Sequence, residues 1–482
     1  MSDRSQPEIP GTDTNPFTSA VPMELAKQVQ GSLLSTEEGY PTVWWWRGTW
    51  MVYDEVKGWR ASGKDWAESF CYRVVDGLVV QKYDGRTRET SNQRWTATLS
   101  SVRELTKCLE MVCERDPFCE VPSWTTGAQV FDADFCISFR DAVVGVGTGE
   151  VDVRTRTANW FDTMTVQTDY DGFAECPRWV ECVESWGEGM EGWGRLLQEW
   201  MGYCLMPTTK YAKWMFMMGR PRSGKGTITK VLEELMGGGA YLGISLYDFG
   251  SNFGLHGLET ARALVVNEVS ELDKKSAERA TQVVKSVLGQ DSISIDRKNQ
   301  DVLRNVRVDA TITMVSNQVV QLPNRGQGLG SKMLVLPFRQ SWMGHEDFGL
   351  FRELRGEMQG IAAWAVEGAR RLVENRGVFS VVEGADETER EFRMVNNPID
   401  AFLEARFEPN PASWTSSAMV LRQYESWCRS VGEPIQYNDR TLIRAILGDS
   451  TWRLERRRRG DQNRRGLQGM VLRRYYQDDE ES

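Results

Sequence analysis

The sequence predicts an α/β protein with a parallel sheet at its centre, a mixed α+β region before the sheet and a helical unit with a basic hairpin after it. Apolar runs of strand length alternate with helical segments from Trp214 to Phe338, the rhythm of a parallel sheet. A glycine-rich turn follows the first of these runs. The pattern restarts near Asn396, where helical segments precede an arginine-rich end.

Composition excludes several classes of protein. The 482 residues are 40% hydrophobic and 26% charged, with a net charge of −10, as in a globular protein of several domains. The chain lacks an apolar run of membrane-spanning length and an N-terminal secretory signal, so we expect a cytoplasmic protein (the host cytoplasm if it is viral) without a membrane partner. Nine cysteines without a C-x-x-C pair favour a reducing compartment. Two histidines, His256 and His345, are too few for a centre of clustered imidazoles.

Four parts are expected in chain order. Residues 1–22 are polar and aperiodic and predict a flexible tail. The mixed α+β region is predicted at 23–206, the parallel-sheet domain at 207–385 and the C-terminal unit at 395–482. Within the mixed region the expected elements are a hairpin at 42–59, a helix at 101–115, two strands around Gly-Thr-Gly at 135–153, and helices at 177–205.

A strand, a loop and a helix follow one another from Lys213. The apolar run to Met218 leads into a loop and a helix that is expected from Ile228 to Met236. In such a loop, backbone N–H groups and the helix N-terminus bind phosphate, and a lysine adds charge for the β- and γ-phosphates. We therefore expect ATP to be bound by Gly219, Arg220, Pro221, Arg222, Ser223, Gly224, Lys225, Gly226 and Thr227.

The loop departs from the pattern G-x-x-x-x-G-K-[ST] at one position. Gly226 follows Lys225, so the hydroxyl expected to contact Mg²⁺ comes one residue later, at Thr227. The nonamer also resembles the loop of adenylate kinases. Those kinases are small and open with this loop, whereas here more than 200 residues precede it, which disfavours a small-molecule kinase.

Two later strands of the predicted sheet end in polar residues. The apolar run from Arg262 to Val266 ends in Asn267 and Glu268, and the run Ala310–Val315 ends in Ser316 and Asn317. Beside a phosphate loop, the Glu268 carboxylate is expected to activate water as general base or to help hold the metal. The Asn317 amide is expected to orient the γ-phosphate or the water. Glu271 and Asp273 are interpreted as a solvated helix start.

The stretch from Gly219 to Phe338 resembles superfamily 3 helicases, specifically the module of phage, plasmid and poxvirus-type primase–helicases. The resemblance extends to both sides and covers most of the chain from about residue 35. The motifs that carry it are GRPRSGKGT, LETARALVVNEVSEL, VVKSVLGQDSISIDRKNQ, TITMVSN and SKMLVLPF.

This resemblance implies an AAA+-type ATPase that assembles as a ring, usually a hexamer, around DNA, with ATP between subunits. By position, Lys225 and Thr227 match the phosphate loop, Glu268 the acidic strand end and Asn317 the sensor amide. The segment 291–300 matches a hairpin that lines the ring pore. Its Arg297 and Lys298 are expected to contact the backbone of a single DNA strand, and the alternative is a solvated charged turn. Duplex DNA is expected at the fork.

Relatives place an arginine before the strand that ends in Pro-Phe, and this arginine acts on the neighbouring subunit's nucleotide. Here that position is Lys332, which lacks the planar fork of arginine. Because an arginine finger contributes about 10³–10⁵ in rate, hydrolysis is expected to be slow unless Arg325 takes its place. Arg220 and Arg222 either contact a neighbouring subunit or lie in solvent, and solvent is the favoured interpretation.

Family members often carry a primase domain ahead of the ATPase. Asp132 and Asp134 superficially match the paired carboxylates of such a site, but the archaeo-eukaryotic-type primase site also uses a histidine and none precedes His256. Asp132 and Asp134 are therefore interpreted as a turn. A separate primase or polymerase remains a possible partner.

The C-terminal segment is strongly basic within an acidic chain. Residues 453–474 contain nine arginines and two acidic residues, for a local charge of +7. Strands around Trp452 and Met470–Leu472, with helices at about 411–430 and 439–447, predict a winged helix-turn-helix-like domain. Its basic hairpin favours phosphate contacts with DNA or RNA. The expected DNA-binding residues are Arg456, Arg457, Arg458, Arg459, Arg464 and Arg465.

The leading hypothesis is a ring-forming, ATP-dependent DNA helicase that acts in replication of a virus, phage or mobile element. The alternative is an origin recogniser or helicase loader in which ATP switches assembly without strong unwinding. The lysine at position 332 is the sequence feature that favours the alternative.

Overall fold

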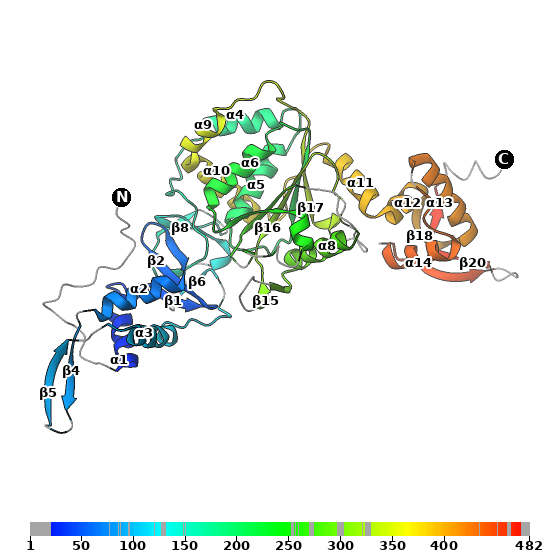
Figure 1. Ribbon diagram of the computed structural model, residues 1–482. Coiled ribbons are helices and arrows are strands. Elements are labelled where there is room, and N and C mark those ends of the chain that lie inside the picture. Colours follow the sequence, from blue (N-terminus) through cyan, green and yellow to red (C-terminus); the bar gives the residue numbers. More distant parts are fainter. Residues whose placement is uncertain are drawn as a thin grey trace.

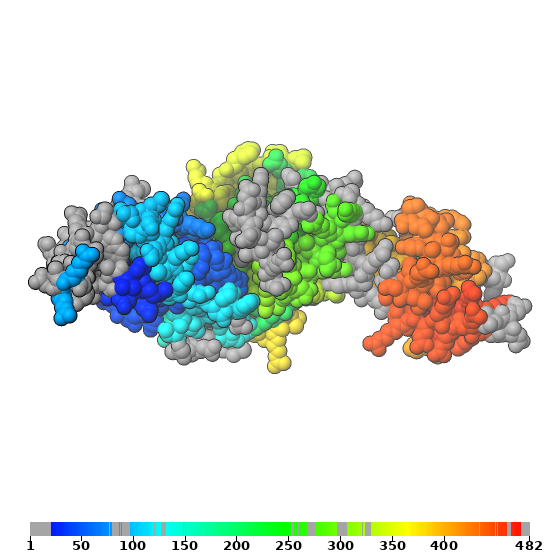
Figure 2. Space-filling view, turned by 60° about the horizontal axis from the view of Figure 1, so that its bottom comes forward, coloured from blue at the N-terminus to red at the C-terminus, as the bar shows by residue number. Residues whose placement is uncertain are grey.

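The computed structural model describes residues 21–473 except 77, 85, 87, 95–96, 120, 127–131, 148, 150, 252–254, 256, 259, 269–273, 296–302, 321, 323–328, 433, 451 and 460–463. The tail predicted at 1–22 therefore lies almost wholly outside the described residues. The molecule is elongated, with the N-terminal elements at one end, the parallel sheet in the middle and the C-terminal unit at the other end (Figures 1 and 2).

The N-terminal elements enclose a small core of their own. Val43, Trp50, Phe70 and Leu105 are among the buried residues that form it. The hairpin predicted at 42–59 is confirmed and extended by a third antiparallel strand, and the predicted helix is α3. The elements are α1 (Pro22–Leu33), β1 (Val43–Trp46), β2 (Thr49–Asp54), β3 (Gly58–Ser62), α2 (Lys64–Val75), β4 (Val79–Asp84), β5 (Glu89–Arg94) and α3 (Leu99–Val112).

Short strands connect this region to the central sheet. The two strands predicted at 135–153 are three in the structure, because a tight turn at 139–141 separates β7 from β8 ahead of the glycine-containing turn to β9. The predicted helices at 177–205 are α4 and α5. The elements are β6 (Ser123–Trp124), the 3₁₀ turn η1 (Ala133–Phe135), β7 (Cys136–Ser138), β8 (Ala142–Gly145), β9 (Asp152–Thr155), β10 (Trp160–Phe161), α4 (Pro177–Trp186) and α5 (Trp193–Leu205).

Five parallel strands form the central sheet in the order β12-β13-β16-β11-β17. Their residues are largely buried because α5, α6 and α10 gather on one side and α8 lies on the other (Figure 1). The elements are β11 (Trp214–Gly219), α6 (Lys225–Met236), β12 (Tyr241–Ser245), α7 (Leu246–Gly250), β13 (Ala263–Glu268), α8 (Lys274–Gly289), β14 (Ser292–Ile295), β15 (Leu303–Arg307), β16 (Thr311–Ser316), η2 (Gly330–Lys332) and β17 (Met333–Phe338).

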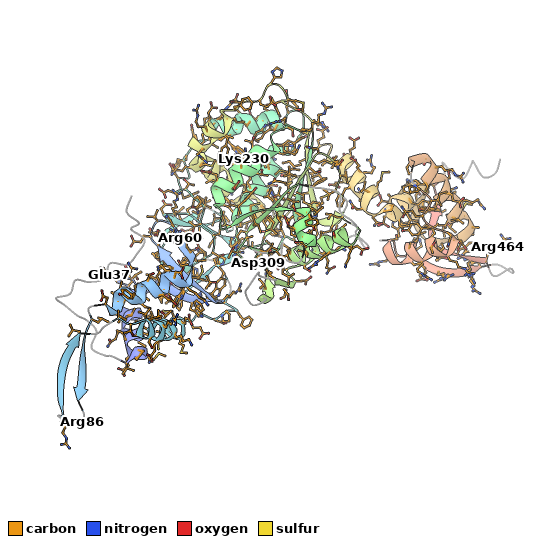
Figure 3. The ribbon with its side chains drawn as sticks, in the orientation of Figure 1. Glu37, Arg60, Arg86, Lys230, Asp309 and Arg464 are labelled. Atoms are coloured by element: carbon orange, nitrogen blue, oxygen red, sulfur yellow. The ribbon has the colours of Figure 1, made fainter. Side chains whose placement is uncertain are left out.

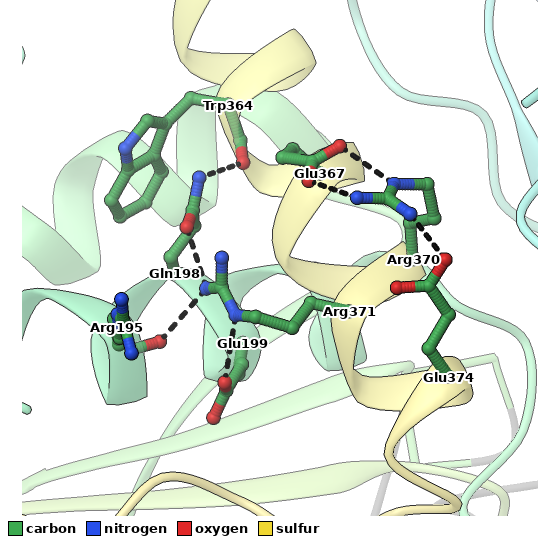
Figure 4. Close-up of polar contacts among 8 residues, drawn as sticks. All are labelled: Arg195, Gln198, Glu199, Trp364, Glu367, Arg370, Arg371 and Glu374. Atoms are coloured by element: carbon green, nitrogen blue, oxygen red, sulfur yellow. Dashed lines mark hydrogen bonds and ion pairs between the residues drawn. The ribbon is translucent and has the colours of Figure 1, made fainter. Parts of the chain in front are cut away.

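Helices α9 (Leu350–Gly356), α10 (Met358–Glu374) and α11 (Ala385–Asn396) follow the sheet. Glycines at positions 202 and 368 allow helices α5 and α10 to approach closely. A side chain at either position would collide with the backbone of the opposite helix. The buried Glu199 carboxylate accepts from Arg371 Nε at 2.9 Å, which ties α5 to α10 (Figure 4). It also accepts from the backbone N–H of Ser380, in the segment after α10, at 2.7 Å.

One large hydrophobic cluster extends from Ile137 to Phe392. It includes Trp179 and Trp200, from helices that precede the sheet, together with Phe216 and Ile312 from the sheet itself. Trp200 Nε1 donates to Thr313 Oγ1 at 2.9 Å, which fixes α5 on the sheet. The cluster crosses the boundary predicted between residues 206 and 207, and the division of the chain into domains stays a prediction.

The C-terminal unit has a separate core and an antiparallel sheet in the order β18-β20-β19. The helix predicted at 411–430 begins only at Ser417, so that prediction was wrong for residues 411–416. Pro409 and Pro411 favour extended backbone, and the segment pairs with β20 across an irregular register. The elements are α12 (Pro398–Arg406), β18 (Phe407–Ser416), α13 (Ser417–Val431), α14 (Asp439–Asp449), β19 (Glu455–Arg459) and β20 (Arg464–Leu472).

The strand predicted around Trp452 begins later, at Glu455, and Trp452 packs against the core of the C-terminal unit instead. Across the described part of the chain, the helices are all too short or too polar to cross a membrane.

Candidate functional site

A glycine-rich loop (Gly219–Gly224) joins the end of β11 to the start of α6. Gly224 has φ +100°, and a Cβ there would lie 2.5 Å from the indole ring of Trp186. Gly219 lies against the backbone carbonyl of Phe338, where a side chain would also collide. Glycine is therefore required at both ends of the loop, which lets the backbone turn sharply from strand to helix.

Lys225, the first residue of α6, is 6% exposed and folds back over the loop. Its ammonium group donates to the carbonyl oxygens of Gly219 at 2.8 Å and Arg220 at 2.7 Å, and to Ser223 Oγ at 3.0 Å. Burial lowers the pKa of Lys225 to about 8. A cation is thus held against the loop without a carboxylate partner among the described residues, ready to exchange carbonyl acceptors for an anion.

The N-terminus of α6 adds further anion-binding capacity. Its N-cap residue is Gly224, so no side chain accepts from the first backbone N–H groups of the helix. The first hydrogen bonds of the helix run from the N–H groups of Thr227 and Ile228 to the Gly224 carbonyl, at 2.9 and 3.1 Å. A buried ammonium group and an uncapped helix N-terminus together form a site that favours phosphate.

The sheet brings the predicted strand ends to the same edge as this loop. Strand β16 lies between β13 and β11, and Met218 is level with Ser316. Because all three strands are parallel, Asn317 and the C-terminal end of β13 lie at the edge where the loop begins. Asn317 is exposed there, and Glu268 ends β13, although its side chain lies outside what the structure describes.

Lys332 lies at the opposite edge of the sheet. It precedes β17, whose other end, Phe338, is level with Gly219. Six residues of strand separate the two edges by roughly 20 Å, so Lys332 does not reach its own loop. Its ammonium group donates to the Leu288 carbonyl at the end of α8, at 3.3 Å. The alternative cation, Arg325, lies outside the described residues.

The hairpin predicted to line a pore is present as the antiparallel pair β14 and β15. Its tip, which carries Arg297 and Lys298, lies outside the described residues, as do Glu271 and Asp273.

Arg222 is exposed, so its position does not contradict the solvent interpretation, which stays a prediction. Its guanidinium forms an ion pair with Glu346 at 3.6 Å, and its carbonyl accepts from the Trp342 N–H at 2.9 Å. Arg220 is exposed. Asp132 caps the 3₁₀ turn η1 by accepting from the Asp134 N–H at 3.1 Å, so these two carboxylates form the predicted turn.

The predicted DNA-binding arginines lie together on β19 and the start of β20. All five residues of β19 are exposed, and Arg458 and Arg459 are paired across the sheet with Arg465 and Arg464. Figure 3 shows Arg464 at the outer end of this hairpin. We define the arginine hairpin as Arg456–Arg459 with Arg464 and Arg465.

Sequence reasoning missed two further exposed cations in the C-terminal unit. Arg440 and Arg444 are exposed on α14, four residues apart and therefore on one face of the helix. Their spacing within a segment already predicted to be helical was the signal that pointed to them.

The fold and the site together define an α/β protein with a parallel sheet and, at one sheet edge, a glycine-rich loop that holds a buried lysine. The family model DUF5906, described as a family of unknown function, matches residues 217–329, which include this loop and strands β13 and β16. A search of curated proteins found no match.

Two solved structures with similarity to this chain are apo structures of the NrS-1 C-terminal region. The A form is 11% identical, covers 83% of this chain and 99% of that chain, and has a TM-score of 0.38. The other is 12% identical, covers 85% of this chain and 100% of that chain, and has a TM-score of 0.40.

Proposed function

We propose that this protein is a P-loop ATP hydrolase that acts on DNA as a ring-forming helicase in the replication of a virus, phage or mobile element. The observation that carries the proposal is the position of the glycine-rich loop. It holds the buried Lys225 ammonium at the N-terminus of α6, at the same sheet edge as the ends of β13 and β16. Phosphoryl transfer needs a phosphate cradle beside groups that orient water, and the common position of the loop and the two strand ends supports assigning both tasks to this edge.

Each residue at this edge has an assigned task in the proposal. Lys225 leaves its carbonyl acceptors and binds the β- and γ-phosphates, Asn317 orients the γ-phosphate or the water, and Glu268 accepts the proton of the water. Thr227 and Glu268 supply oxygens that suit Mg²⁺. When bound, the metal ion neutralises charge on the phosphates.

The motor part of the proposal requires a second subunit. Lys332 lies at the sheet edge remote from its own loop, which supports assigning it to the nucleotide of a neighbour in a ring, usually a hexamer. The arginine hairpin supplies exposed positive charge for duplex DNA at the fork, and the β14–β15 tip supplies contacts to a single strand.

A second candidate is an origin recogniser or loader in which ATP controls assembly. Lysine in place of arginine at position 332 favours it, because an ammonium group lacks the bidentate geometry that stabilises the transition state. A separate primase or polymerase is a candidate partner in either case.

The test measures ATP binding, DNA-stimulated ATP hydrolysis and forked-duplex unwinding for the wild-type protein and Glu268→Gln. The proposal predicts that Glu268→Gln binds ATP with wild-type affinity and loses hydrolysis by at least about 100-fold. Hydrolysis without unwinding in the wild-type protein would favour the loader. Wild-type hydrolysis in Glu268→Gln would contradict the assigned base.

A further inference from the structure

A cavity of about 460 Å³ opens beside the N-terminal half of α6. Gly224, Thr227 and Lys230 line it from the helix side, at positions three residues apart that share one helix face. Figure 3 labels Lys230 on this helix. The volume falls within the range of about 300–1,000 Å³ that is typical of small-molecule sites.

Aromatic and charged side chains line the other walls, and the charged ones include Arg178, Glu181 and Asp347. Trp186 comes from α4, Trp342 from the segment after β17, and Phe351 from α9. Trp186 is held in place by the edge-on ring of Trp179 at 5.7 Å, and its indole also contacts Gly224. Flat aromatic walls around a cavity of this size suit a planar heterocycle, because rings stack with little loss of conformational freedom.

The cavity begins where the anion-binding site ends. Gly224 and Thr227 belong both to the start of α6 and to the cavity lining. A phosphate chain at the helix N-terminus therefore has a direct path for its organic end past Thr227 and toward Lys230. A ligand that joins a polyphosphate to a planar ring fills both spaces.

Hydrogen bonds fasten the aromatic wall to the loop. Ser341 Oγ donates to the Pro221 carbonyl at 2.7 Å, and the Trp342 N–H donates to the Arg222 carbonyl at 2.9 Å. The segment that carries Trp342 is further tied to α4 by the ion pair between Arg178 and Asp347 at 2.9 Å. The cavity is thus positioned together with the phosphate-binding groups.

We infer that this cavity is the subsite for the base and ribose of the nucleoside triphosphate, with Trp342 and Phe351 as specificity-determining walls. The inference rests on the proposed ATP-binding function of the glycine-rich loop. The nucleoside is thus assigned to residues 178–186 and 342–351. These two segments precede and follow the loop in sequence, and both lie outside the stretch that contains the nucleotide motifs.

The test compares the binding of ATP with that of inorganic tripolyphosphate, which has the phosphate chain but no base. Isothermal titration calorimetry is performed on the full chain with Mg²⁺. Trp342→Ala is expected to weaken ATP binding on the order of ten-fold, the value of a lost stacking contact, while tripolyphosphate binding is unchanged. The control is Met343→Ala, which removes an exposed neighbour that does not line the cavity.

Unchanged tripolyphosphate binding also shows that Trp342→Ala leaves the loop folded, and Phe351→Ala gives an independent repeat from another element. Equal loss of both ligands, or loss of neither, would overturn the subsite. Lys225→Ala separates this failure from failure of the proposed function. If Lys225→Ala binds both ligands like the wild-type protein, the loop is not the phosphate site and the subsite falls with it.

Discussion

The glycine-rich loop and the arginine hairpin both carry positive charge, but they do so in opposite environments. Lys225 is 6% exposed, makes three hydrogen bonds to its own loop and has a lowered pKa, whereas all five residues of β19 are exposed. A buried cation with fixed acceptors suits one anion of defined shape. An exposed row of cations suits a polyanion, whose binding depends on salt and hardly on sequence.

The largest expected effect comes from the buried cation. Lys225→Ala is expected to reduce ATP hydrolysis by at least about 1,000-fold, because phosphoryl transfer relies on charges fixed against the phosphates. Lys64→Ala is a matched control, since Lys64 is also the first residue of a helix with a glycine N-cap but is exposed. Steady-state hydrolysis assays measure both. Equal activity of the two variants would show that the buried Lys225 ammonium matters no more for hydrolysis than the exposed Lys64 ammonium.

The arginine hairpin is tested by replacing Arg456, Arg457, Arg458 and Arg459 with alanine. Loss of four phosphate contacts is expected to weaken DNA binding about 10–100-fold on all sequences and to reduce the slope of log K against log salt by up to about 3.6. Fluorescence anisotropy at several salt concentrations measures this. ATP hydrolysis without DNA should not change, and the double replacement of Arg422 and Arg429 on α13 is the control within the same unit. An unchanged salt slope would exclude the hairpin from DNA binding.

The loop conformation predicts different effects on stability for alanine at Gly224 and at Gly226. Gly224→Ala is expected to destabilise the protein by about 1–3 kcal/mol, because it combines a positive φ with a collision against Trp186. Gly226→Ala is the matched control, since a Cβ there meets nothing within 4 Å and its φ is ordinary for a helix. Thermal or denaturant unfolding measures both. Equal stability of the two variants would contradict the described loop conformation.

The smallest expected effect is a difference in pH dependence. Burial lowers the pKa of Lys225 from its usual value of 10.5 to about 8, so the ligand-free ammonium loses its proton as pH rises through 8. The cost of burying this charge is present below pH 8 and is relieved between pH 8 and 10.5. In the proposed function ATP binds the charged form, so the affinity for ATP is expected to fall toward about ten-fold per pH unit above pH 8.

The exposed arginines stay charged throughout this range, so DNA binding by the hairpin should be flat from pH 7 to pH 9. Calorimetric titration of ATP at several pH values tests the contrast. Parallel pH profiles for ATP and DNA would show that Lys225 does not control the difference.

The strand-loop-helix around Lys225 could be predicted from sequence because glycine, lysine and apolar periodicity act locally. The alternation of apolar runs with helical segments also predicted a parallel sheet, in which the ends of β13 and β16 lie at one edge. The aromatic cavity could not be predicted, since Trp186 and Trp342 come from segments that flank the motif-bearing stretch and meet only after folding. The extended conformation of 411–416 was missed because its pairing with β20 is a long-range contact.

The most direct test of the central claim is a crystal or cryo-electron microscopy structure with Mg²⁺ and a non-hydrolysable ATP analogue. Lys225 Nζ is expected to leave the carbonyl oxygens of Gly219 and Arg220 and to lie about 2.7–3.2 Å from a β- or γ-phosphate oxygen, with Asn317 and Glu268 facing the γ-phosphate. A nucleotide bound elsewhere, with Lys225 still donating to the loop, would contradict the account.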